Sequence, residues 1–302
     1  MTTLPPSRSF FKHPIVSGGI KLAVTVACLW YVSRKIDWLL TWQLLGTSSK
    51  WWLVVAVIFF ALSKIVSAFR LNIYFKNIGV MLPGPTNLKL YWLGMFYNLF
   101  LPGGIGGDAY KVVALNRKGK YPAKKLSAAV LLDRLSGVAG LGILLALYFF
   151  LLFKGDKYST AVLLAVVPAL ALYYLLVRLV FPSFLSNYLS TLLLGITVQV
   201  LQVLCVYCLM QSIALSSHLN AFVLLFLLSS VVAILPFTIG GLGAREVVFL
   251  WGSTQLSLDP HQSIYISVLF YLVTVVVSLI GAMWIFRDPL ANLKQVSAEL
   301  NV

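Results

Sequence analysis

The chain has 302 residues, of which 60% are hydrophobic and only 10% are charged. A soluble domain of ordinary composition has about 25% charged residues, so this composition excludes a soluble globular protein and indicates several membrane-spanning helices. The net charge of +15 would suggest nucleic-acid binding in a soluble protein. Much of the excess lies in loops between apolar segments, where cations mark the cytoplasmic side of a membrane protein and attract anionic head groups. We therefore expect no nucleic-acid partner.

Six apolar segments are long enough to cross a membrane, which takes about 20 residues. In chain order they are 15–33, 51–69, 127–153, 158–181, 187–213 and 262–286. Two further apolar stretches, 88–102 and 219–236, run directly into Pro-Gly sequences. We expect each to enter the membrane as a half-helix and to return, through 103–116 and 243–253 respectively. The predicted fold class is an all-α polytopic membrane bundle with six full spans and two broken, re-entrant segments.

The two Pro-Gly sequences are near copies of each other. LPGGIGGDAYK at 101–111 aligns without a gap on LPFTIGGLGAR at 235–245. Gly/Pro-interrupted hydrophobic segments in corresponding positions of two halves point to the binding site of a transporter. The sequence therefore predicts two repeats, at about 51–153 and 187–286.

Cation counts in the short loops predict that the two repeats have opposite orientations. The loop at 110–126 holds six cations, whereas 214–220 and 254–261 hold none. With six spans, both termini lie in the cytoplasm, and the two broken segments enter from opposite sides. The loop at 34–50, with three cations, does not fit this scheme, and its side stays open.

The glycines of the two motifs have two interpretations. Consecutive glycines expose backbone N–H groups that form an anion-binding nest, and the alternative is that they only let helices pack closely. The candidate nest residues are Gly103, Gly104, Gly106, Gly107, Gly240, Gly241 and Gly243. A nucleotide-binding loop is not expected, because no βαβ pattern and no Gly-Lys-Ser/Thr sequence accompanies them.

Ionisable side chains within apolar segments are costly and mark functional sites by default. The candidates for head-group binding or gating are Lys64, Arg70, Asp108, Lys111, Asp133, Arg134, Arg245 and Glu246. Adjacent helical residues point about 100° apart, so the doublets 133–134 and 245–246 do not pair internally. We expect pairs between the doublets, such as Asp133 with Arg245, or Arg134 with Glu246. The alternative is that such pairs only hold the repeats together, but the excess of cations suits a phosphate.

The sequence contains no Ser/His/Asp arrangement or paired carboxylates for catalysis, and no set of metal ligands. Cys205 and Cys208 have metal-like spacing but no second ligand pair, so we interpret them as packing residues. We therefore expect no catalytic residues, no metal, no cofactor and no enzyme activity.

Three motifs together resemble the flippase-like membrane domain of lysylphosphatidylglycerol synthases. They are GGIGGDAYK at 103–111, LLDRLSG at 131–137 and LPxxIGGLGxRE at 235–246. The resemblance implies one integral membrane domain over 1–302, in the bacterial inner membrane, that moves lipids between leaflets. The family positions present here are Gly106, Gly107, Asp108, Asp133, Arg134, Gly240, Gly241, Arg245 and Glu246. The synthases carry a soluble aminoacyl-transferase domain after this region, whereas this chain stops soon after 262–286, so we do not expect lysyl transfer.

Two functions follow from these observations. The first is a lipid translocator whose partner is a membrane phospholipid or a polyprenyl-phosphate-type lipid. The alternative is a non-transporting membrane protein that anchors or regulates a lipid-modifying enzyme or a glycosyltransferase.

Overall fold

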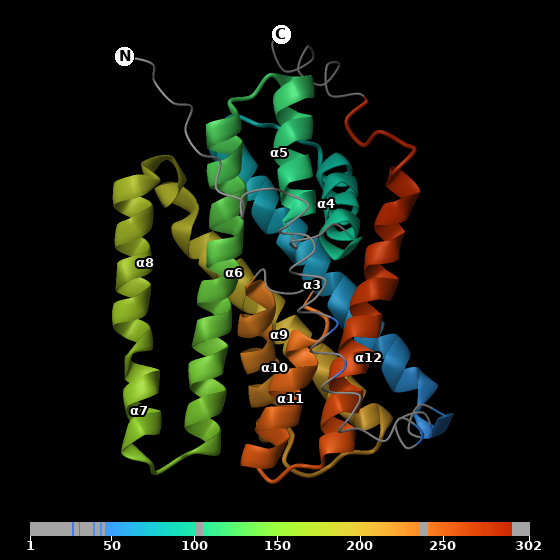
Figure 1. Cartoon of the computed structure of the whole chain (residues 1–302). Helices are drawn as coiled ribbons and strands as arrows, with labels where there is room; N and C mark the ends of the chain where they lie inside the picture. Colours follow the sequence, from blue (N-terminus) through green and yellow to red (C-terminus); the bar gives the residue numbers. More distant parts are fainter. Residues whose placement is uncertain are drawn as a thin grey trace, which may run out of the picture.

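The computed structural model describes residues 46–100, 105–235 and 241–291, together with Val26, Trp30, Leu39 and Gln43. All regular structure within these residues is helical (Figure 1). The α-helices are α3 (Lys50–Asn77), α4 (Gly84–Phe100), α5 (Gly106–Gly119), α6 (Ala123–Leu152), α7 (Lys157–Leu164), α8 (Val166–Val180), α9 (Tyr188–Ser212), α10 (Leu219–Ile234), α11 (Ala244–Gln255) and α12 (Pro260–Leu279). Short 3-10 helices, η2 (Pro182–Asn187) and η3 (Ile280–Trp284), precede α9 and follow α12.

Five helical segments of the described chain are long and apolar enough to cross a membrane. They are Lys50–Asn77, Ala123–Leu152, Lys157–Val180, Pro182–Ser212 and Pro260–Trp284. In lipid every backbone polar group must be satisfied within its own segment, and helices achieve this. The prediction of a polytopic helical membrane bundle is confirmed, and five of the six predicted spans coincide with these helices. The sixth, 15–33, lies outside the described residues apart from Val26 and Trp30.

Two of the predicted spans differ from the observed helices for physical reasons. The predicted span at 51–69 stopped before Arg70, but α3 continues to Asn77 because Arg70 is buried and paired. The predicted span at 158–181 is divided into α7 and α8 at Ala165. Pro168 explains this break, since it has no N–H to donate to the carbonyl group of Leu164.

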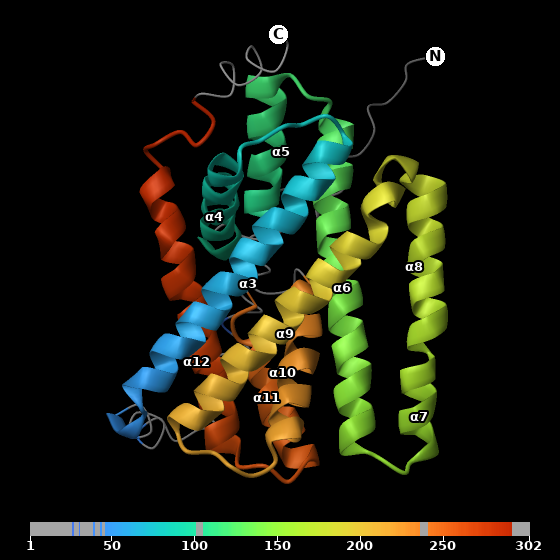
Figure 2. The same cartoon turned by 180° about the vertical axis from the view of Figure 1, so that it is seen from behind.

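One order of helices occurs twice: a long helix, two short helices and another long helix. The first series is α3 to α6, the second is α9 to α12, and the α7–α8 hairpin connects them. The leading helices α3 and α9 lie side by side and antiparallel (Figure 2). The N–H of Ser49 donates to the carbonyl oxygen of Ser212 at 2.8 Å, which joins the start of α3 to the end of α9. At the other end, Asn187 Nδ2 donates to Asn77 Oδ1 at 2.6 Å.

The antiparallel arrangement of α3 and α9 sends the short helix pairs to opposite ends of the molecule. The α4–α5 pair occupies the upper half in Figure 1, and the α10–α11 pair occupies the lower half. The chain runs inward along α4 and α10 and outward along α5 and α11 (Figures 1 and 2). Therefore the first residues of α5 and α11, which belong to the two glycine motifs, lie near the middle of the bundle.

Small residues allow the closest helix contacts. A Cβ atom on Gly107 would collide with the backbone carbonyl group of Gly94, so α4 and α5 touch through their backbones. Gly140 of α6 and Gly195 of α9 make a similar contact where these helices cross. Gly107 therefore lies at a close contact between two helices.

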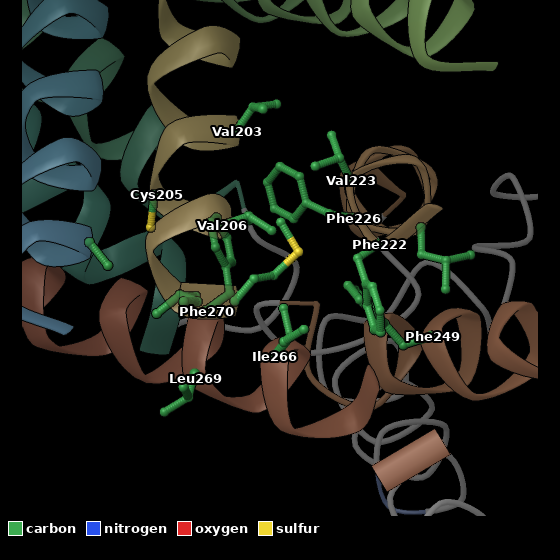
Figure 3. Packing of buried hydrophobic residues seen from close by; sticks show 14 of the residues in the cluster. Val203, Cys205, Val206, Phe222, Val223, Phe226, Phe249, Ile266, Leu269 and Phe270 are labelled. Atoms are coloured by element: carbon green, nitrogen blue, oxygen red, sulfur yellow. The ribbon is translucent and has the colours of Figure 1, made fainter. Parts of the chain in front are cut away.

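An apolar core lies between α9, α10, α11 and α12. Phe226 of α10 and Phe270 of α12 have ring centroids 4.7 Å apart, and Phe249 of α11 is fully buried nearby (Figure 3). Phe60 of α3 joins this core, with its ring centroid 5.4 Å from that of Phe270. These rings connect the first long helix to the second series.

Candidate functional site

The structure brings the eight candidate ionisable residues into one network between α3, α5, α6 and α11. Each of these helices contributes two of them. Ion pairs join residues of α3, α5 and α6, and Lys64 of α3 and Arg245 of α11 contact one aromatic cluster. Arg134, which pairs with Asp108 of α5, is the neighbour of Asp133, which pairs with Arg70 of α3, and this links the three helices. The network contains five cations and three carboxylates.

A buried ion pair joins α3 to α6. Arg70 Nε donates to Asp133 Oδ1 at 2.8 Å, and the two residues are 4% and 7% exposed. The Arg70 Nη1 atom is buried and has no acceptor among the described residues. The guanidinium group lies against Gly137 and Gly195, where the missing side chains make room for it. This arrangement fixes α3 to the LLDRLSG motif of α6, at 131–137.

Asp108 bridges two cations near the start of α5. Its carboxylate accepts from Lys111 Nζ at 3.0 Å and from Arg134 Nε at 2.5 Å. The Lys111 ammonium also lies 4.4 Å from the centroid of the Tyr91 ring on α4. The GGIGGDAYK motif at 103–111 and the LLDRLSG motif at 131–137 are therefore in direct contact.

The expected pairs between the doublets are wrong. Asp133 pairs with Arg70, and Arg134 pairs with Asp108. Glu246 instead accepts from the N–H of Gly243 at 2.7 Å and from Ser267 Oγ at 3.0 Å. The reason is local, because a glutamate in the first turn of a helix reaches back to cap the free N–H groups at its start.

Lys64 and Arg245 have no carboxylate within ion-pair distance anywhere in the described part of the chain. The Arg245 guanidinium lies 4.9 Å from the ring centroid of Phe270 and 5.9 Å from that of Phe226. Lys64 Nζ lies 4.5 Å from the ring centroid of Phe60. Because these three rings are in contact, both cations rest on one aromatic cluster.

Two of the backbone N–H groups proposed for an anion nest already donate hydrogen bonds to side chains of the protein. The N–H of Gly107 donates to Asn98 Oδ1 at 2.8 Å, and the N–H of Gly243 is bonded to Glu246. Gly241 and Gly243 have φ angles of 80° and 83°, which favour glycine. Gly106 is the first residue of α5. Gly103, Gly104 and Gly240 lie outside the described residues, and anion binding by the motif glycines stays a prediction.

One groove lies beside the network, and a second lies farther along α6. One, of about 410 Å³, runs between α5 and α6 and has Asp108 and Arg134 in its wall, together with apolar residues such as Val112 and Leu131. The Arg134 side chain is 36% exposed. The other, of about 500 Å³, lies between α6, α7, α8 and α10 and has an apolar lining.

The sequence analysis did not identify the three aromatic residues on which Lys64 and Arg245 pack. Phe60, Phe226 and Phe270 are ordinary apolar residues of apolar helices, so no local signal distinguishes them from lipid-facing residues. Ser267, the second partner of Glu246, was also missed. Only the packing of α3, α10, α11 and α12 brings these side chains to the site.

Comparison with known proteins identifies a related family. The family model described as "Lysylphosphatidylglycerol synthase TM region" matches residues 19–192 and 183–281, nearly the whole chain. The second match begins just before α9 and ends within η3. A search of curated proteins gives no match.

Proposed function

The chain belongs to the lysylphosphatidylglycerol synthase TM-region family, and from this we propose that it translocates an anionic or phosphate-bearing lipid between the leaflets of the bacterial inner membrane. One observation carries the proposal. Two short helix pairs run inward from opposite ends of a membrane bundle, and an ionisable network lies where they turn back. Transporters with broken helices bind their substrates at such places.

The lengths of the short helices support a re-entrant interpretation. At 1.5 Å per residue, the 16 residues of α10 extend about 24 Å, less than the roughly 30 Å of a bilayer core. The 12 residues of α11 extend only about 18 Å. We interpret α4–α5 and α10–α11 as re-entrant segments, and the series α3–α6 and α9–α12 as inverted repeats of one membrane domain. Alternating access by rocking of two such repeats is a common mechanism.

The groove between α5 and α6 suits the lateral access of a lipid. Its apolar residues match acyl chains, and the partly exposed Arg134 offers a charge to a head group at the same opening. The apolar groove beside α7 and α8 provides further space for acyl chains. In this proposal the head group passes through the polar network while the chains stay in lipid.

Translocation is tested with the purified protein in vesicles that contain a fluorescent phosphate-bearing lipid in both leaflets. Chemical quenching of the outer leaflet measures the exchange rate, which the protein should raise above that of protein-free vesicles. Arg134→Gln should lower the rate about tenfold by removing one charged contact to the head group, while Asp108 keeps Lys111 as its partner.

Arg178→Gln is the matched control, because Arg178 is exposed on α8 and should leave the rate unchanged. If the wild-type protein accelerates no phosphate-bearing lipid, translocation is wrong. A non-transporting partner of a lipid-modifying enzyme then becomes the better interpretation.

Opposite orientations of the repeats, with both termini in the cytoplasm, are tested by labelling. In a variant without its three natural cysteines, single cysteines at 118–124 should react only from the cytoplasmic side. Single cysteines at 254–260 should react only from the other side. Reaction of both loops from one side contradicts the inverted arrangement.

A further inference from the structure

Two cations of the network differ from the other three. Arg70, Lys111 and Arg134 each contact a carboxylate, whereas the described residues provide none for Lys64 or Arg245. Both are half-buried. Both also lie against one cluster of phenylalanine rings, which places two like charges in one region of the bundle. Holding two like charges together in a membrane bundle is unfavourable unless an anion joins them.

The aromatic cluster holds the two cations but leaves their donors available. Phe60, Phe226 and Phe270 attract the cations through the negative faces of their rings. No described residue accepts a hydrogen bond from Lys64 or Arg245. A guanidinium group packed on a ring keeps its N–H edge for a planar or tetrahedral oxyanion, and an ammonium group binds phosphate as a point charge. The two cations come from different series, one from α3 and one from α11.

The charge of the two cations indicates the charge of the ligand. Lys64 and Arg245 carry two positive charges, and no described carboxylate lies within ion-pair distance of either. A phosphate monoester carries about −1.5 to −2 charges at pH 7, whereas a phosphodiester carries one. We propose that Lys64 and Arg245 bind the phosphate monoester of a lipid head group. This inference rests on the proposed lipid function and names the class of lipid.

Binding is measured on the whole purified chain in detergent, by native mass spectrometry and thermal shift. The probes are phosphatidic acid, which has a phosphate monoester, phosphatidylglycerol, which has a diester, zwitterionic phosphatidylcholine, and inorganic phosphate. We expect phosphatidic acid to bind at least tenfold more tightly than phosphatidylglycerol. Inorganic phosphate should compete weakly, since it lacks the acyl chains.

Neutral variants locate the site. Lys64→Gln and Arg245→Gln should each weaken phosphatidic acid binding about tenfold to a hundredfold, the usual effect of losing a charge-assisted hydrogen bond. Lys64→Arg and Arg245→Lys keep the charge and should retain most of the affinity. The matched controls are Lys76→Gln and Arg178→Gln, which alter exposed cations on α3 and α8 and should bind as the wild type does.

Several results would overturn the inference. Equal binding of phosphatidic acid and phosphatidylglycerol by the wild type excludes a monoester site, whether or not any variant folds. Unchanged binding by both neutral variants excludes Lys64 and Arg245. Inorganic phosphate binding as tightly as phosphatidic acid indicates a site for soluble phosphate and excludes the lipid.

The vesicle assay separates this inference from the translocation proposal. Binding through the two cations without transfer of phosphatidic acid supports the site and contradicts translocation. Transfer that persists in both neutral variants supports translocation and contradicts the site.

Discussion

The two short helix pairs carry similar motifs, identical at five of eleven positions, yet they hold their cations differently. Lys111 and Arg245 occupy matching positions at the ends of the two motifs. Three residues before Lys111 lies Asp108, which pairs with it, whereas the matching residue before Arg245 is Leu242. Arg245 therefore packs on aromatic rings. One of the differences between the copies thus separates a cation in an ion pair from a cation that has no carboxylate partner among the described residues.

The helix contacts of the two pairs differ in the same sense. In α4–α5, Gly107 packs against the backbone of Gly94. In α10–α11, Gly252 packs against the flexible end of the Leu225 side chain. Backbone-to-backbone packing has no rotamer with which to adjust, whereas a leucine side chain has several. The glycine contact of the first pair is thus the less adjustable of the two.

The largest expected effect is the loss of the shared carboxylate in the first pair. Asp108→Asn removes the carboxylate that Lys111 and Arg134 share and should lower the free energy of unfolding by about 3–5 kcal/mol. Denaturant unfolding in detergent measures this change. A loss below about 1 kcal/mol, within the range of exposed ion pairs, would contradict the structural role of the first pair.

An intermediate effect should separate the packing of the two pairs. Gly107→Ala forces a methyl group into the backbone of Gly94 and should cost about 1–3 kcal/mol of folding free energy. Gly252→Ala meets only the end of Leu225 and gains helix propensity, so its net effect should stay within about 1 kcal/mol. The control is Gly142→Ala, since that glycine of α6 has no neighbour within 4 Å of an added Cβ. Equal losses at Gly107 and Gly252 would remove this distinction.

The smallest expected effect is the neutralisation of the second pair. Arg245→Met leaves no described carboxylate without a partner, so the free energy of unfolding should change by less than about 1 kcal/mol while lipid binding falls. The same unfolding measurement as for Asp108→Asn provides the comparison. A loss as large as that of Asp108→Asn would show that Arg245 is structural, and the contrast between the pairs would disappear.

By itself the sequence determined the class of the fold and the set of candidate residues. Hydropathy predicted the helices α3, α6, α9 and α12 and the short helices around both motifs, because a membrane requires every segment to satisfy its own backbone groups. The charged residues of the network were also visible, since ionisable side chains are rare in apolar segments. These properties are local and can be read along the chain.

Only the tertiary structure decided which residues meet. The partnership of Arg70 with Asp133, and of Asp108 with Arg134, depends on which faces of α3, α5 and α6 pack together. The contact of Arg245 with aromatic rings depends on the packing of α10 and α12 against α11. In the sequence, Phe226 and Phe270 resemble any other apolar residue. Hydropathy is summed along one helix, whereas an ion pair is a distance between two atoms on different helices. The division into paired and unpaired cations, on which the proposed site depends, therefore emerges only when the helices are packed.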